Sequence, residues 1–265
     1  MKNGFVIFLT AFGVLFVSWC GFVLGPQLQL GRAKQATVLN ASDVYPTARP
    51  GEAAQGLQIY RANGCAACHT EQVQQDGMMC DVVLTAPGKN PAAVSNLIST
   101  LKLRSLTEEQ AQAAADKISA AGGKSETHVL ATGVDITRGW GLRRSVAEDF
   151  LYDYPVQPGS VRIGPDLAGV AARTDANTLL QRLYAPKSIV KDSVMPPFRY
   201  LFETKKIGDA PSPDALNLPK GFEPAAGYEI VPTSDAKKLV AYLLSLHADV
   251  PLYDAPFTPA APAKP

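Results

Sequence analysis

Residues 65–69 read Cys-Ala-Ala-Cys-His, and no other feature constrains this chain as strongly. The pattern C-x-x-C-H is typical of covalent c-type haem attachment. Two thiols at this spacing add across the two vinyl groups of one haem, and the adjacent histidine is held beneath the iron. The motif occurs once in 265 residues. The sequence therefore predicts one haem c, bound through Cys65 and Cys68, with His69 as an axial ligand.

Two other kinds of site use cysteines at this spacing. A thioredoxin-like redox pair needs a βαβ context, which the sequence does not show here. A zinc site needs a second cysteine pair, and the remaining cysteines, Cys20 and Cys80, do not supply one. Four cysteines in this length are also too few for a disulfide scaffold. Both alternatives are therefore weaker than the haem interpretation.

Residues 5–24 form an uncharged, apolar run. At 1.5 Å per residue, such a run spans about 30 Å, which matches the core of a bilayer. It exceeds the roughly 7–15 apolar residues of a signal-peptide core, although a cleaved signal peptide is the alternative. We expect a single-pass anchor at residues 1–26, ended by Gly25-Pro26. Lys2 favours an N-terminus inside the inner membrane and a haem domain on the periplasmic, exported side.

The rest of the chain predicts a mostly α protein without long strands. Residues 27–50 have the composition of a linker. Residues 203–232 carry five prolines and are predicted as loop, and residues 251–265 as a disordered Pro/Ala-rich tail. The haem domain is predicted at residues 51–250, with a helical and loop insertion at about 71–150. Caps and apolar spacing predict helices at residues 52–63, 91–103, 107–121, 174–185 and 235–247.

Charge is nearly balanced, with 25 basic and 24 acidic residues. No basic excess is present to bind a phosphate backbone, which argues against a nucleic-acid partner. Any docking to another protein must then depend on local patches. Lys187, Lys191 and Arg199 could steer an acidic donor protein, although a solvated face explains the same charges.

The second axial ligand is predicted from the sequence Ser-Val-Met-Pro-Pro-Phe around Met195. Pro196 and Pro197 stiffen the chain beside this thioether, which can then reach the open face of the iron. His–Met ligation raises the reduction potential and closes the iron to substrate, which favours electron transfer over catalysis. The alternatives are an open position, as a haem-based sensor requires, or ligation by Met78, Met79, His128 or His247.

A helix ending in CAACH, the Gly-Pro-Asp-Leu turn, the SVMPPF loop and an amphipathic last helix resemble the class I cytochrome c fold. The resemblance covers about residues 52–70 and 162–247. It implies that the first and last helices cross, with Gly56 and Tyr60 against residues 239–243.

The same resemblance implies a proximal wall for the haem. Gly164, Pro165 and Leu167 would lie beside His69, and the Pro165 carbonyl would accept the proton of the second ring nitrogen. Arg162, just before this turn, could contact a haem propionate, and a surface ion pair is the alternative.

A more specific resemblance lies in YDYPVQPGSVRIGPDLAGVAART, residues 152–174, followed by a helix and DSVMPPF. These segments resemble the mono-haem cytochrome c subunit of cbb3-type cytochrome c oxidases, the CcoO/FixO family. The resemblance implies a membrane-anchored, non-catalytic subunit that receives electrons from a donor cytochrome c or another oxidase subunit. It would pass them to the haem–copper catalytic subunit. The long interval between residues 69 and 152 departs from the family pattern, and a free-standing membrane-anchored electron shuttle is the alternative.

Overall fold

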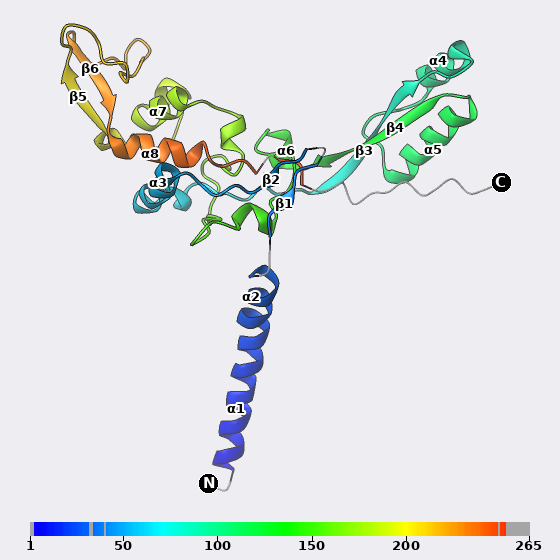
Figure 1. Ribbon diagram of the computed structural model, residues 1–265, viewed down its shortest axis with the longest axis horizontal. Helices are drawn as coiled ribbons and strands as arrows, with labels where there is room; N and C mark the ends of the chain where they lie inside the picture. The colour runs from blue at the N-terminus through cyan, green and yellow to red at the C-terminus, as the bar shows by residue number, and fades with distance from the viewer. Residues whose placement is uncertain (1–2, 32–33, 40, 249, 253–265) are drawn as a thin grey trace.

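The computed structural model describes residues 3–31, 34–39, 41–248 and 250–252 (Figure 1). The chain is 41% helical, which agrees with the predicted mostly α class. Nearly all of the predicted tail, from residue 253 onward, lies outside the described residues.

A long helix stands apart from the rest of the protein at the N-terminus (Figure 1). It comprises α1 (Gly4–Trp19), the π-helical segment η1 (Cys20–Leu24) and α2 (Gly25–Leu30). The stretch from Gly4 to Gln29 is long and apolar enough to cross a membrane, and none of the residues in its most apolar part is buried against the rest of the protein. The prediction that Gly25-Pro26 ends the helix is wrong. Proline is tolerated in a first helical turn, and the π segment changes the hydrogen bonding directly before it.

Two crossing helices organise the body that carries the CAACH motif. α3 (Gly51–Ala62) and α8 (Ser234–Leu243) approach so closely that a Cβ on Gly56 would lie 2.7 Å from Tyr242 Cβ. The rings of Tyr60 and Tyr242 also contact each other, with centroids 5.2 Å apart. The expected crossing of the first and last helices is therefore present, and a single apolar core surrounds it.

α7 (Ala176–Tyr184) packs beside α8 and closes this core. The sequence predicts a helix at residues 174–185 with Thr174 as its cap, but the N-cap is Asp175, whose carboxylate accepts a hydrogen bond from Thr178 N at 3.0 Å. The short linker strands β1 (Ala36–Thr37) and β2 (Val44–Tyr45) pair with each other. The remaining short helices are η2 (Cys65–Ala67), α6 (Val134–Thr137), η3 (Ala147–Phe150), η4 (Val170–Ala172), η5 (Pro186–Ser188) and η6 (Arg199–Leu201).

A hairpin replaces part of the loop expected at residues 203–232. β5 (Phe202–Lys206) pairs antiparallel with β6 (Tyr228–Pro232). Phe202, Ile230 and Val231 are buried and fix the hairpin to the core. The prolines do not prevent pairing, because four of the five fall in the connection and the last ends β6.

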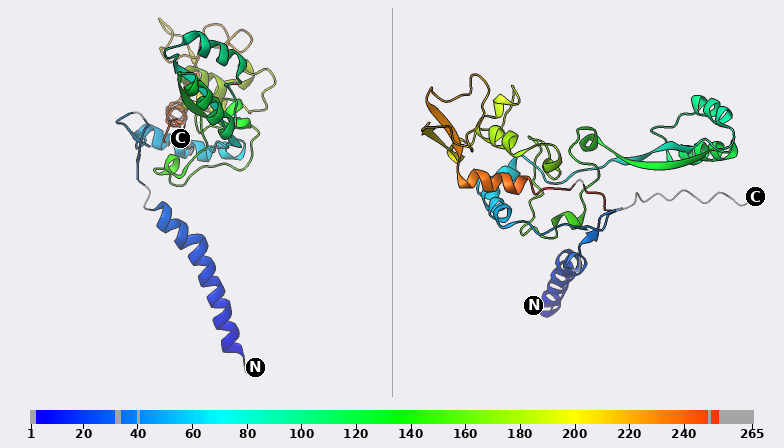
Figure 2. Two further views of the ribbon diagram at one scale, coloured as in Figure 1. Left: turned by 90° about the vertical axis from the view of Figure 1, so that its right-hand side faces the viewer. Right: turned by 45° about the horizontal axis from the view of Figure 1, so that its top comes forward.

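The insertion is a compact unit that projects away from α3, α7 and α8 (Figures 1 and 2). It runs β3 (Gly77–Ala86), α4 (Pro91–Thr100), α5 (Glu108–Ala120) and β4 (Lys124–Thr132), with β3 and β4 antiparallel. The two helices were expected, but the two long strands were not. The unit has its own core, which includes the buried thiol of Cys80. The insertion is therefore an α/β unit and not the helical and loop segment that was predicted.

Candidate haem-attachment site

The CAACH motif begins where α3 ends. Gly64 adopts a left-handed conformation with φ of +66°, and the chain then enters η2. The backbone N–H groups of Cys68 and His69 both donate to Cys65 O, at 3.1 and 3.0 Å. Both thiols are free and partly buried. Burial raises the pKa of Cys65 to about 11, so this thiol is protonated at neutral pH.

His69 is held in one orientation by the loop that was expected to support it. Its Nδ1 lies 2.8 Å from Pro165 O. A proton on Nδ1 satisfies this contact and leaves Nε2 as the ring nitrogen that can bind a metal. Burial is also the main cause of a lowered pKa for His69, which favours the neutral, ligating form of the ring.

The Gly-Pro-Asp-Leu turn lies directly against the motif. Gly164 N donates to Cys68 O at 2.8 Å, and Leu167 N donates to Thr70 O at 2.7 Å. A Cβ on Gly164 would lie 2.6 Å from His69 Nδ1, so any larger residue would displace the ring or the turn. The structure thus brings together residues that the sequence separates by almost one hundred positions: Cys65, Cys68, His69, Gly164, Pro165 and Leu167.

Asp166 is a supporting residue that the sequence analysis did not single out. Its carboxylate is fully buried and accepts hydrogen bonds from Thr70 Oγ1 at 2.6 Å and Gln72 N at 2.8 Å. It also accepts from Ala168 N at 2.9 Å. Its position between Pro165 and Leu167 could have predicted this role. A carboxylate in a buried turn needs several hydrogen-bond donors around it.

Arg162 makes its contacts with the protein. Its Nη1 lies 2.7 Å from both carboxylate oxygens of Asp135, and its Nε donates to Thr70 Oγ1 at 3.1 Å. Its Nη2 donates to Gln72 O. Arg162 therefore forms an ion pair with Asp135, but this pair is largely buried and is not the surface pair that was the alternative. The propionate contact stays a prediction.

Met195 is partly buried and packs against the same core as Cys65 and Ala66. The loop that carries it is fixed at two points. Phe198 N donates to Leu183 O at 2.8 Å, and the Tyr200 hydroxyl donates to Asn63, two residues before Cys65. Among the alternative ligands, Met78 and Met79 belong to β3, His128 to β4, and His247 lies beyond the end of α8.

These residues fit one covalently attached haem. Two free thiols have the required spacing, and the adjacent histidine offers Nε2 while its Nδ1 is engaged. Glycine at position 164 leaves the imidazole room against the supporting turn. A thioether on a fixed loop borders the same core.

Residues 135–217 match the family model FixO, described as cytochrome C oxidase, mono-heme subunit. This match confirms the resemblance to the FixO family. The FixO segment begins within α6 and ends after the Met195 loop, so it includes Arg162, the Gly-Pro-Asp-Leu turn and α7. The CAACH motif and the insertion strands precede it. No curated protein matches the chain.

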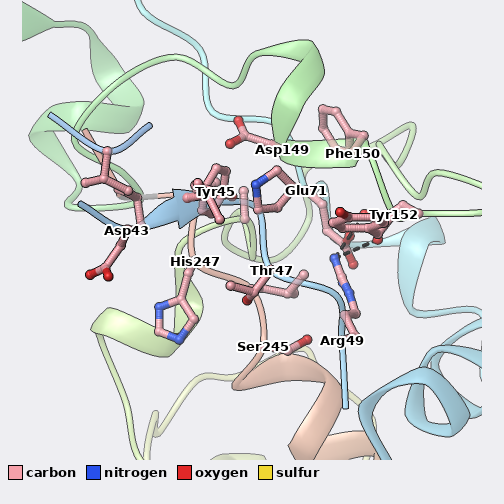
Figure 3. Close-up of a pocket in the computed structure, with 18 of the residues that line it drawn as sticks. Asp43, Tyr45, Thr47, Arg49, Glu71, Asp149, Phe150, Tyr152, Ser245 and His247 are labelled. Atoms are coloured by element: carbon pink, nitrogen blue, oxygen red, sulfur yellow. Dashed lines mark hydrogen bonds and ion pairs between the residues drawn. The ribbon is translucent and has the colours of Figure 1, made fainter. Parts of the chain in front are cut away.

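A separate cavity of about 570 Å³ lies between linker residues 38–49, residues 142–153 and the segment that follows α8 (Figure 3). Arg49 pairs there with Asp153 at 2.8 Å. The Tyr242 hydroxyl lies 2.9 Å from both oxygens of Glu71, and burial raises the pKa of this carboxyl to about 8. Of the residues proposed as haem ligands, Cys65, Cys68, His69 and Met195 do not line this cavity, whereas the alternative ligand His247 does. The cavity is therefore distinct from the CAACH motif.

Proposed function

We propose that this protein is an electron-transfer subunit of a cytochrome c oxidase and carries one covalently bound haem c. The observation that carries the proposal is the contact between His69 Nδ1 and Pro165 O at 2.8 Å. His69 belongs to the CAACH motif, which lies outside the FixO match, whereas Pro165 belongs to the matched segment. The two independent indications therefore meet in one site.

Each residue of the site then has a defined role within a class I cytochrome c fold. Cys65 and Cys68 attach the haem, and His69 and Met195 ligate its iron. When bound, the haem supplies a one-electron couple between ferric and ferrous iron. Pro165 keeps the proton on Nδ1 of His69, which fixes the ligating tautomer.

The proposed partner is the haem–copper catalytic subunit of a cbb3-type oxidase, with a donor cytochrome c or another oxidase subunit supplying electrons. An exposed, apolar strip at residues 152–163 supports a permanent partner. Tyr154 is 92% exposed and Ile163 59% exposed, and the only charged groups of the strip are paired with Arg49 and Asp135. Exposed apolar side chains gathered in one segment are typical of a protein interface, and a permanent partner would cover them.

The proposed arrangement in the membrane follows from the N-terminal helix. Residues 1–26 would anchor the protein in the inner membrane. The helix continues for about one turn beyond residue 26, to Leu30. Residues 27–50 would link the anchor to an exported domain. Residues 51–250 would form the haem domain, with the insertion projecting from it.

Purification of the full chain in mild detergent tests this function. A c-type haemochrome at one haem per chain is expected, together with co-purifying haem–copper oxidase activity. Cys65→Ser with Cys68→Ser is expected to abolish haem attachment. An extractable haem or two haems per chain would contradict the attachment site. A haem-loaded monomer without oxidase activity would favour the membrane-anchored shuttle.

A further inference from the structure

We propose that Asp135 and Arg162 act as positioning residues for His69, and that this ion pair couples the base of the insertion to the electronic properties of the haem site. The inference rests on the proposed function, because it requires His69 to ligate a haem iron. It concerns two residues that touch neither the thiols nor the imidazole, but that hold the segments on both sides of the imidazole.

The first link is the guanidinium of Arg162. It binds the carboxylate of Asp135 in α6, and it also binds Thr70 and Gln72, the residues that follow His69. α6 begins two residues after β4 ends, so Asp135 stands at the base of the insertion. A single side chain therefore fixes the distance between the insertion and the chain next to the proximal ligand.

The second link is the carboxylate of Asp166. Thr70 Oγ1 accepts from Arg162 and donates to Asp166, while Gln72 N donates to the same carboxylate oxygen. Asp166 directly follows Pro165, whose carbonyl lies against His69 Nδ1. Thr70 and Asp166 are each adjacent in sequence to one partner of this contact. Displacement of either residue changes the geometry of the hydrogen bond to the ring.

Burial gives the pair its stiffness. The side chain of Asp135 is 4% exposed and that of Arg162 is 25% exposed. Asp135 also accepts from Gln74 N at 2.7 Å, and the guanidinium lies 5.9 Å from the centre of the Trp140 ring. Hydrogen bonds between charged groups are shorter and stronger than those between neutral groups, and loss of one partner of a buried pair leaves an unpaired charge.

The expected consequence is a change in reduction potential. When the ring nitrogen that does not bind the metal donates a hydrogen bond, the ligating nitrogen of the histidine is more basic. A more basic ligand favours the more oxidised state of the metal. If the Pro165 contact is loosened, the ferric state is less stabilised and the reduction potential rises. Removal of the Asp135 charge acts in the same direction, because a nearby negative charge favours the ferric state.

The test uses the haem-loaded full chain in detergent. Asp135→Asn removes one charge, whereas Arg162→Lys keeps the charge but loses the planar guanidinium that binds acceptors on three residues. Both variants are expected to retain one haem per chain, to have a higher reduction potential than wild type, and to shift the paramagnetic resonances of the proximal histidine. Should Asp135→Asn fail to accumulate, Asp135→Glu and Arg162→Lys decide the outcome.

Asp149→Asn is the matched control. Asp149 forms a pair with Arg143 at 2.8 and 3.0 Å, and its side chain is 3% exposed. Asp149 also accepts a hydrogen bond from Val146 N and is hydrogen-bonded to the Tyr45 side chain. These partners lie outside the network of Thr70, Gln72 and Asp166 that surrounds His69. This variant should lower the denaturation midpoint to a similar degree but leave the potential unchanged.

The outcomes separate the inference from the function on which it rests. Equal potentials and unchanged histidine resonances in wild type, Arg162→Lys and the Asp135 variants, despite lowered stability, would overturn the positioning role. A wild-type chain that acquires no covalent haem would overturn the proposed function itself.

Discussion

Substitution of Gly56 by alanine tests whether close contact between α3 and α8 holds the body together. The added Cβ would lie 2.7 Å from Tyr242 Cβ and from Lys238 C, and closer still to Lys238 O. Carbon atoms in favourable contact are about 3.5 Å apart, so the two carbon contacts alone require the helices to separate by about 0.8 Å. The closer contact with Lys238 O requires a larger shift. Overpacking of this kind costs about 1–3 kcal/mol.

Separation of the helices also weakens two contacts of Tyr242. Its ring contact with Tyr60 contributes about 0.5–1.5 kcal/mol beyond area burial. Its hydroxyl is the donor to the buried carboxylate of Glu71, and a buried polar group without a partner costs about 1–3 kcal/mol. Alanine regains about 1 kcal/mol of helix propensity. With partial loss of the two contacts, the net destabilisation comes to about 1–4 kcal/mol, which is large for a single substitution.

Urea denaturation of the haem-loaded chain, followed by far-ultraviolet circular dichroism, measures this free energy of unfolding. Gly51→Ala is the matched control in the same helix, because a Cβ there meets nothing within 4 Å. The control is expected to unfold at the wild-type midpoint or slightly above it. If Gly56→Ala were as stable as Gly51→Ala, the close crossing of α3 and α8 would be refuted.

Three further substitutions have defined outcomes. Met195→Ala should abolish the sulfur-to-iron charge-transfer band of the ferric protein, and an unchanged absorption spectrum would assign the ligand elsewhere. Gly164→Ala places a Cβ 2.6 Å from His69 Nδ1 and should lower the free energy of unfolding by about 1–3 kcal/mol, with an altered ferric spectrum; a wild-type urea midpoint would contradict this. Tyr242→Phe removes one hydrogen-bond donor to the buried Glu71 carboxyl group and should cost about 1–3 kcal/mol in the same assay. A loss below about 0.5 kcal/mol would show that the Tyr60 hydroxyl, which also interacts with Glu71, satisfies the group alone.

Local signals predicted the helices and the core of the site. The pattern Thr-Glu-Glu-Gln predicts a capping box at residues 107–110, which is present. Thr233 and Ser234 were both candidates to cap the last helix, and Thr233 is the N-cap of α8. Such caps are visible in sequence because donor and acceptor lie within four residues of each other. The CAACH motif is equally local, and the Pro165 contact followed from a resemblance that spans the fold.

Features that depend on distant partners were missed. β3 and β4 have one covered face and one exposed face, and Asp81, Glu126 and His128 interrupt their apolar pattern. Only the helices that cover one face make these strands stable, and short-range periodicity does not report that packing. The same holds for Arg162, since its partner Asp135 is far away in sequence and nothing local marks the two as neighbours.

The insertion begins and ends at residues that face each other, because Gly77 is paired with Thr132. The chain therefore leaves the body formed by α3, α7 and α8 and returns to it at one place. A two-residue turn joining such neighbours is the commonest way to close a hairpin. We therefore expect that the segment between them can lengthen, shorten or be replaced without a change in the path of the chain around His69. Asp135 lies outside the segment between Gly77 and Thr132. Its ion pair with Arg162 would therefore be kept when that segment changes.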